Sequence, residues 1–167
     1  ESGNVRVRGN MFIRDSVAVY IDDSPFHPDD SDDFERNVFR LDDTGVIFHS
    51  SPHGTSFRRC SFRDNGVQVR VDGGGDALGM VWDSNDWDDY AGYDLNGDGV
   101  GDVPYALRSL SVDLVDAHPN LAFFAGAPTL ALVEAAGRAL PLFEPRTILR
   151  DPHPRMEPLP LGGLDAD

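Results

Sequence analysis

Short apolar segments recur along the first hundred residues, and each contains one aromatic side chain. The aromatic positions are Phe12, Phe39, Phe62 and Trp82, at intervals of 27, 23 and 20 residues. A polar turn follows each of the first three, and then a run in which β-branched and polar residues alternate, at 17–21, 46–48 and 67–71. Alternation with period two is typical of strands, and the Gly, Asn and Asp between the runs indicate turns.

No helical pattern separates these runs, so each unit is predicted to be one coil of a parallel β-helix with two short strands per coil. About four coils are expected over residues 1–105. Equivalent residues of successive coils stack ~4.8 Å apart, which predicts one internal ladder of the four aromatic side chains. An antiparallel sandwich of hairpins is the alternative, because alternation alone does not fix strand direction. The rest of the predicted core is Val17, Val19, Val46, Phe48, Val67 and Val69.

Two segments depart from this pattern. The acid-rich run at 29–33 is predicted to be a solvated excursion from one corner of the coil. After Tyr105, apolar residues at 110–136 are spaced as in short helices, and the prolines at 141–160 indicate an extended, irregular chain. Residues 106–167 are therefore predicted to form a short-helical cap and a Pro-rich tail, in one structural unit with the coils.

The N-terminal end of the predicted solenoid has no such cap. Residues 4–8 begin directly in the repeat pattern, which leaves an unpaired strand edge. We expect either that further coils precede this edge in a longer protein or that it pairs with another chain, for example in self-association.

Charge narrows the range of partners. Acidic residues outnumber basic ones 29 to 14, the formal net charge is -15, and every basic residue is Arg. A field of this sign repels nucleic acid and anionic lipid, so neither is an expected partner. The longest apolar run, 121–133, is broken by Gly126 and Pro128 and is shorter than the ~20 residues of a membrane span, so no membrane insertion is expected.

The segment 94–102 carries the clearest metal-binding pattern. Counted from Asp94, oxygen-bearing side chains fall at positions 1, 3, 5 and 9, a glycine at 6 and a backbone carbonyl at 7, as in the first part of an EF-hand loop. The predicted ligands of a structural calcium ion are Asp94, Asn96, Asp98, Val100 and Asp102. A bidentate carboxylate is missing at position 12, so Asp86, Asp88 or Asp89 would have to supply it. A metal-free turn of Asx and Gly residues is the alternative.

Soft-metal ligands are scattered. The best pair is His153 and Met156, in a stiff Pro-flanked segment, and imidazole with thioether would suit a transient Cu(I) ion. Cys60 is the one cysteine, so no intrachain disulfide can form.

Signatures of catalysis are mostly missing, including a phosphate-binding Gly-Lys motif and a nucleophile elbow. No lysine base exists, and the many carboxylates are not seen to converge. The protein is therefore not expected to be an enzyme. A calcium-stabilised β-helix that binds or processes carbohydrate remains the alternative, because that fold often hosts such activities.

The run NDWDDYAGYD at 85–94, continued by NGDGVGDVPY at 96–105, resembles the C-terminal signature of the NosD family of nitrous oxide reductase maturation proteins. YIDDSP at 20–25, DNGVQV at 64–69 and GGGD at 73–76 are similar to its last coils. LVD at 114–116, the segment at Pro128 and DPHPRM at 151–156 are similar to its tail.

This resemblance implies a right-handed parallel β-helix that is exported to the periplasm. It further implies a docking scaffold, without catalytic activity, that acts with a copper chaperone and the membrane subunits of an ABC transporter to assemble the copper-sulfur centre of nitrous oxide reductase. Cys60 stands where the repeat elsewhere has Asn.

Overall fold

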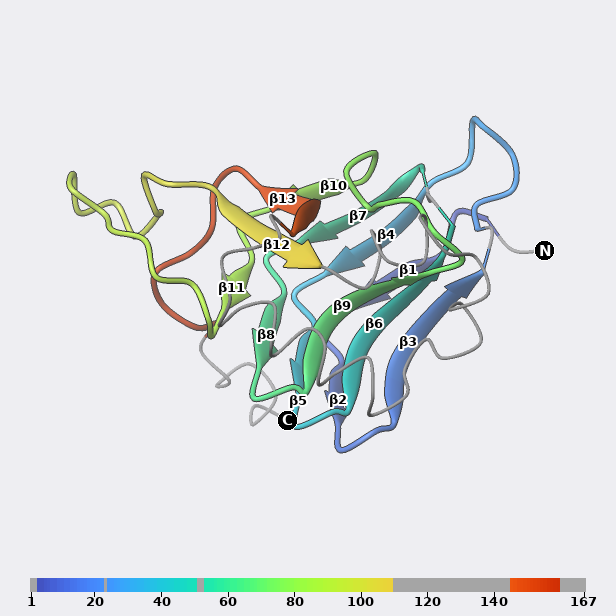
Figure 1. Cartoon of the computed structure of the whole chain (residues 1–167), viewed down its shortest axis with the longest axis horizontal. Helices are drawn as coiled ribbons and strands as arrows, with labels where there is room; N and C mark the ends of the chain where they lie inside the picture. Colours follow the sequence, from blue (N-terminus) through green and yellow to red (C-terminus); the bar gives the residue numbers. More distant parts are fainter. Residues whose placement is uncertain (1–2, 23, 51–52, 110–144, 160–167) are drawn as a thin grey trace.

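The computed structural model describes residues 3–22, 24–50, 53–109 and 145–159, which contain thirteen strands and no helix. Three parallel sheets make up the body (Figure 1). The first contains β1 (Arg6–Arg8), β4 (Asp32–Glu35), β7 (Thr55–Arg58) and β10 (Val81–Asp83). The second contains β2 (Met11–Ile13), β5 (Val38–Arg40), β8 (Ser61–Arg63) and β11 (Asp86–Trp87). The third contains β3 (Val17–Asp22), β6 (Thr44–His49) and β9 (Val67–Asp72).

The chain visits the three sheets in turn and pairs each strand with its equivalent in the next coil, always in parallel. This confirms the predicted parallel β-solenoid and excludes the antiparallel sandwich. Two details of the prediction were wrong. Each full coil has three strands, whereas two were expected, and there are three complete coils plus two strands of a fourth, whereas about four were expected.

Aromatic side chains form two ladders inside the coil. Phe12, Phe39 and Phe62 stack at 5.0 and 4.8 Å between ring centroids, as predicted, and the ladder continues through Trp87 at 4.4 Å. Trp82 was assigned to this ladder incorrectly. It stacks in the first sheet, 4.7 Å from a phenylalanine of β7, because β10 pairs with β7. The second ladder consists of Phe34, Phe57 and Trp82.

Most of the rest of the predicted core is confirmed, since Val46, Phe48 and Val69 are buried and Val19 packs against the buried cluster. Val17 and Val67 were wrongly included. Each is the first residue of its strand, and their exposed fractions are 39% and 36%.

Left-handed backbone conformations turn the chain at the corners between sheets. At the corner between the first and second sheets, Gly9, Arg36, Arg59 and Ser84 have φ of 65°, 56°, 53° and 59°. Because these residues occupy equivalent places in successive coils, the same turn is repeated along the axis. Because the turn is the same in each coil, the same alternate positions of the next strand face the core in every coil.

The end of the coil beyond β10 is covered by an antiparallel pair, β12 (Tyr105–Ser109) and β13 (Arg146–Asp151). Ala77 N donates to the carbonyl of Ile148 at 2.7 Å, and Ile148 and Leu149 are buried. The predicted cap therefore consists of strands where the structure describes it. The helices predicted within 110–144 lie outside the described residues, as does most of the predicted Pro-rich tail beyond 159.

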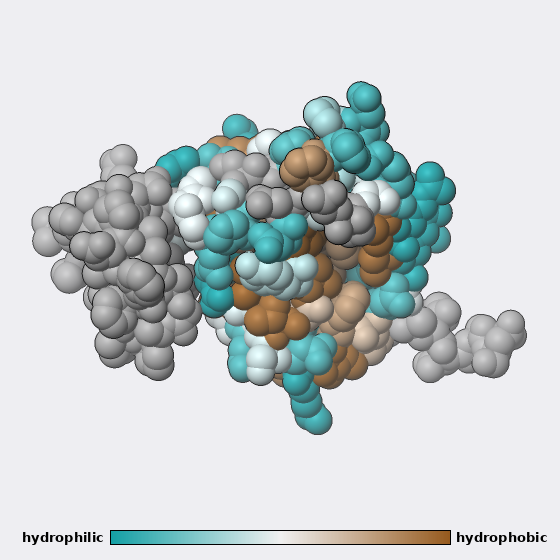
Figure 2. All heavy atoms as spheres, turned by 90° about the vertical axis from the view of Figure 1, so that its right-hand side faces the viewer, coloured by the Kyte–Doolittle hydropathy of each residue, from teal (hydrophilic) through white to brown (hydrophobic). Residues whose placement is uncertain are grey.

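The opposite end presents apolar atoms to the surface. Figure 2 faces the side where the chain begins and shows a brown centre within a teal rim. Five large apolar residues of the first coil are exposed: Val5, Met11, Ile13, Val17 and Tyr20. β1, β2 and β3 each have one strand neighbour in the described sheets.

Candidate functional site

The loop 94–102, predicted to bind calcium, is an exposed turn in the long connection between β11 and β12 (Figure 1). Asp94 organises it, since Oδ1 accepts the amide of Gly97 at 2.7 Å and Oδ2 accepts the amide of Gly99 at 2.8 Å. These N–H groups, that of Gly99 above all, favour the charged carboxylate and lower the pKa of Asp94. Gly97 and Gly99 have φ of 74° and 82°, so glycine permits the turn.

The other predicted calcium ligands hydrogen-bond within the same turn. Asp102 Oδ2 accepts the amide of Leu95 at 2.7 Å, Asp98 Oδ1 accepts the amide of Val100 at 2.8 Å, and Asn96 Nδ2 donates to Asp98 Oδ2 at 2.9 Å. Their oxygens are hard donors of the kind calcium takes. Over the described residues, however, no three carboxylate, imidazole or thiol groups converge as a metal cage. Calcium binding therefore stays a prediction.

The carboxylates considered for the twelfth ligand position have other partners. Asp86 is buried, accepts the hydroxyl of Ser61 at 2.6 Å and lies 3.6 Å from Arg63 Nε. Burial raises the pKa of Asp86, against the opposing effects of Ser61 and Arg63. Asp88 accepts hydrogen bonds from a backbone amide and a side-chain amide of the third coil, and Asp89 accepts one from a tyrosine hydroxyl.

A short segment near the C-terminus, residues 153–156, ties this loop to the coil, and we call it the strap. Gly101 N donates to the carbonyl of Pro154 at 2.7 Å, and Met156 N donates to that of Gly99 at 3.0 Å. On its other side, Arg155 N donates to the carbonyl of the residue before β11 at 2.8 Å. The strap thus lies as an extra strand between the loop and the second sheet.

The two candidate copper ligands are both on the strap and have different surroundings. His153 Nδ1 lies 2.8 Å from Asp83 Oδ1, so Nε2 is the nitrogen left for a metal. The side chain of Met156 is 38% exposed. Copper binding by this pair stays a prediction.

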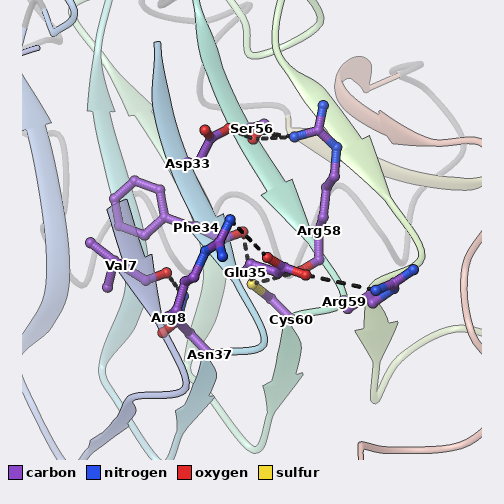
Figure 3. Close-up of polar contacts among 10 residues, drawn as sticks. All are labelled: Val7, Arg8, Asp33, Phe34, Glu35, Asn37, Ser56, Arg58, Arg59 and Cys60. Atoms are coloured by element: carbon purple, nitrogen blue, oxygen red, sulfur yellow. Dashed lines mark hydrogen bonds and ion pairs between the residues drawn. The ribbon is translucent and has the colours of Figure 1, made fainter. Parts of the chain in front are cut away.

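A ladder of side-chain amides runs along the corner between the first and second sheets, and Figure 3 shows one of its members, Asn37, with its partner Val7. Asn37 Oδ1 accepts the amide of Asn10 at 3.0 Å, and Asn37 Nδ2 donates to the carbonyl of Val7 at 2.8 Å. Asn85 repeats this arrangement two coils on, where its Oδ1 accepts the amide of Cys60 at 2.9 Å. Buried side chains thereby satisfy the backbone groups of the turn.

Cys60 occupies an asparagine position of this ladder, as its place in the repeat predicted. Its Sγ lies 3.6 Å from the carbonyl of Phe34, and burial raises the thiol pKa to about 12 (Figure 3). A thiol with such a pKa is protonated at neutral pH, which makes it a poor nucleophile and metal ligand.

Asp151, at the end of β13, completes the ladder and was not found by sequence reasoning. It is fully buried, and its Oδ2 accepts the amide and the side-chain Nδ2 of Asn85 at 3.0 and 2.9 Å and the indole of Trp87 at 3.3 Å. Its Oδ1 accepts the amide of His153 at 3.1 Å. Burial raises the pKa of Asp151, against the opposing effect of these donors. The aspartate takes the place of the asparagine that a further coil would supply.

The outer face of the first sheet carries ion pairs between coils (Figure 3). Glu35 lies 3.3 Å from Arg8 and 3.7 Å from Arg59, and Asp33 lies 3.4 Å from Arg58. In register along the sheet, charges alternate as Arg8, Glu35, Arg58 and Asp83. Alternation avoids like charges at neighbouring positions, and the pairs are exposed enough to contribute little each.

The described residues contain no helix long and apolar enough to cross a bilayer.

No known family model matches the chain. Two curated proteins do, both named "Probable ABC transporter binding protein NosD". The one from Stutzerimonas stutzeri is 26% identical over 133 residues, which cover 74% of this chain and 28% of that protein. The one from Pseudomonas aeruginosa is 33% identical over 72 residues, which cover 43% of this chain and 17% of that protein.

The chain thus spans less than a third of the length of the curated relatives that it matches. Both matches bear the name that the motifs at 85–105 predicted. They confirm that this protein has a NosD-like relationship over part of the length of those proteins.

Proposed function

We propose that this protein is a periplasmic accessory factor in the maturation of nitrous oxide reductase, serving as a docking scaffold for an ABC transporter and a copper chaperone. The observation that carries the proposal is the similarity to two proteins named as ABC transporter binding proteins. That name describes binding, which agrees with the expectation of a protein without catalytic activity. A solenoid of stacked coils also supports it, because each coil contacts its neighbours and the surface is extended.

The metals have distinct parts in this proposal. Calcium is a structural ion of the loop 94–102, supported by the hard oxygen donors of Asp94 and Asp98 and by the glycines that permit the turn. Copper binds transiently to the strap. This is supported by the imidazole of His153 and the exposed thioether of Met156, which would be its ligands.

Binding to purified partners tests the function. The whole chain is immobilised, and the detergent-solubilised transporter and the copper chaperone of the same organism are passed over it. Specific retention of either is expected, with an unrelated acidic β-solenoid as the control surface. Failure to retain either, together with a thermal shift in an acidic polysaccharide, would instead support the carbohydrate-binding alternative.

A further inference from the structure

The connection between β11 and β12 carries exposed apolar side chains on a projecting hairpin. We call residues 90–104 the finger, which extends away from the coil in Figure 1. Leu95 is 83% exposed, more than any other large apolar side chain of the described residues, and Tyr93 is 54% exposed. Val103, on the returning arm, is 38% exposed. Single exposed apolar residues are ordinary on soluble proteins, whereas several on one projection indicate a contact surface.

Hydrogen bonds hold these residues together. Asp102 N donates to the carbonyl of Tyr93 at 2.8 Å, and Asp102 Oδ2 accepts the amide of Leu95 at 2.7 Å. The backbones of both apolar residues are thus held beside the returning arm, where the hydroxyl of Tyr90 donates to the carbonyl of Val103. The strap pairs with the same arm. A surface fixed in advance loses little conformational entropy on binding, which favours affinity.

The charge of the finger defines the chemistry of its partner. The finger contains three acidic residues, Asp94, Asp98 and Asp102, and no basic one, so it stays net negative even with one calcium ion bound. Asp98 and Asp102 are exposed, and Asp102 accepts the amide of Leu95. Electrostatic complementarity therefore calls for a partner surface with an apolar centre and a rim of cationic side chains.

We propose that the finger is the surface by which this protein docks on the transporter, with Tyr93 and Leu95 as apolar anchors inserted into a cation-rimmed site of a transporter subunit. The inference rests on the proposed function and adds to it the surface and its chemistry. The transporter is the partner because the two relatives are named for binding one. Anchors of this kind dominate protein interfaces when they are central and desolvated on binding.

The test compares three variants of the whole chain for binding to the solubilised transporter. Tyr93→Ser and Leu95→Ser remove the anchors, and Leu78→Ser is the matched control, since Leu78 is 48% exposed outside the finger. Each anchor variant is expected to weaken binding about tenfold or more, while the control stays within about twofold of wild type. Binding by wild type should also weaken as NaCl is raised from about 50 to 300 mM, because the acidic rim is screened. Unchanged melting temperatures verify that the variants are folded.

The outcomes separate this inference from the proposed function. If both anchor variants bind the transporter as tightly as wild type, the finger is not the docking surface, and the proposed scaffold function is unaffected. Anchor substitutions that weaken binding to the copper chaperone alone overturn the assignment to the transporter. A wild-type chain that binds neither protein overturns the proposed function and the finger together. Loss confined to the anchor variants, with the expected salt dependence, supports the docking surface.

Discussion

Substituting Asp42 by asparagine should stabilise the protein, because Asp42 holds an unsatisfied buried oxygen. Asp42 is 2% exposed, and its Oδ1 accepts the amide of Asp15 at 2.8 Å. Its Oδ2 has no hydrogen-bond partner. One coil later Asn65 occupies the same place, and there Nδ2 donates to the carbonyl of Phe39 at 3.0 Å. By the strand register, an amide at position 42 would meet the equivalent carbonyl, that of Phe12.

The gain follows from the cost of the orphan oxygen. An unsatisfied buried polar group costs about 1–3 kcal/mol, and a new neutral hydrogen bond contributes about 1 kcal/mol. We expect Asp42→Asn to raise the free energy of unfolding by about 1–2 kcal/mol, and the melting temperature by about 3–6 °C for a domain of this size.

The gain should also depend on pH. Burial raises the pKa of Asp42, against the opposing amide of Asp15, above its ordinary value of 3.8. The contribution of the protonated acid is fully present below that ordinary value and is lost as pH rises through the raised one. The advantage of the asparagine variant should therefore be small in acid and reach its full size near neutral pH.

Urea unfolding of wild type, Asp42→Asn and the converse variant Asn65→Asp measures this between about pH 3.5 and 7.5. The converse variant sets a carboxylate against the carbonyl of Phe39 and should lose about 1–3 kcal/mol at neutral pH. An asparagine variant no more stable than wild type at neutral pH, or an advantage independent of pH, would refute the reasoning.

Three further changes test other parts of the structure. Cys60→Asn should add about 1 kcal/mol of stability in urea unfolding, because the new amide can donate to the carbonyl of Phe34, 3.6 Å from the sulfur; a loss would contradict the ladder. Gly101→Ala should lower stability by about 1–3 kcal/mol, since a Cβ there overlaps the hydroxyl of Tyr90; an unchanged melting temperature would show that the ring can move aside. EDTA should lower the melting temperature if the loop 94–102 holds calcium, and added calcium should restore it. No shift in EDTA removes calcium as a stabilising ion.

The spacing of aromatic residues predicted one ladder and missed the other, for a definite reason. Phe12, Phe39 and Phe62 recur at a regular place after similar turns, so sequence suffices to align them. β4 lies in an acid-rich run and reads as solvated loop. In the structure Asp32 is buried, accepting the amide of Val5 at 2.9 Å. In the sequence, an aspartate that accepts a buried backbone amide looks the same as an aspartate that is exposed to water.

Because the sequence pattern does not predict β4, it also misplaces an aromatic residue further along the chain. Without Phe34 as a second aromatic of its coil, Trp82 was the next available member of the first ladder. Trp87, which does stack on Phe62, lies within an acidic motif whose pattern indicates metal binding and not a core strand. Asp151 is a different case, because it meets Asn85 across 66 residues of sequence, and no local pattern indicates such a pairing.

Asp151 also affects whether copies of this chain can stack end to end. Its carboxylate offers acceptors alone when ionised, and its strand runs antiparallel to β12. At this end of the solenoid the repeat therefore stops in two ways. The side chain at the ladder position can accept hydrogen bonds but donate none, and the strand that carries it is antiparallel to its neighbour. A further parallel coil cannot add here in register, so this end does not allow copies of the chain to stack head to tail into a filament.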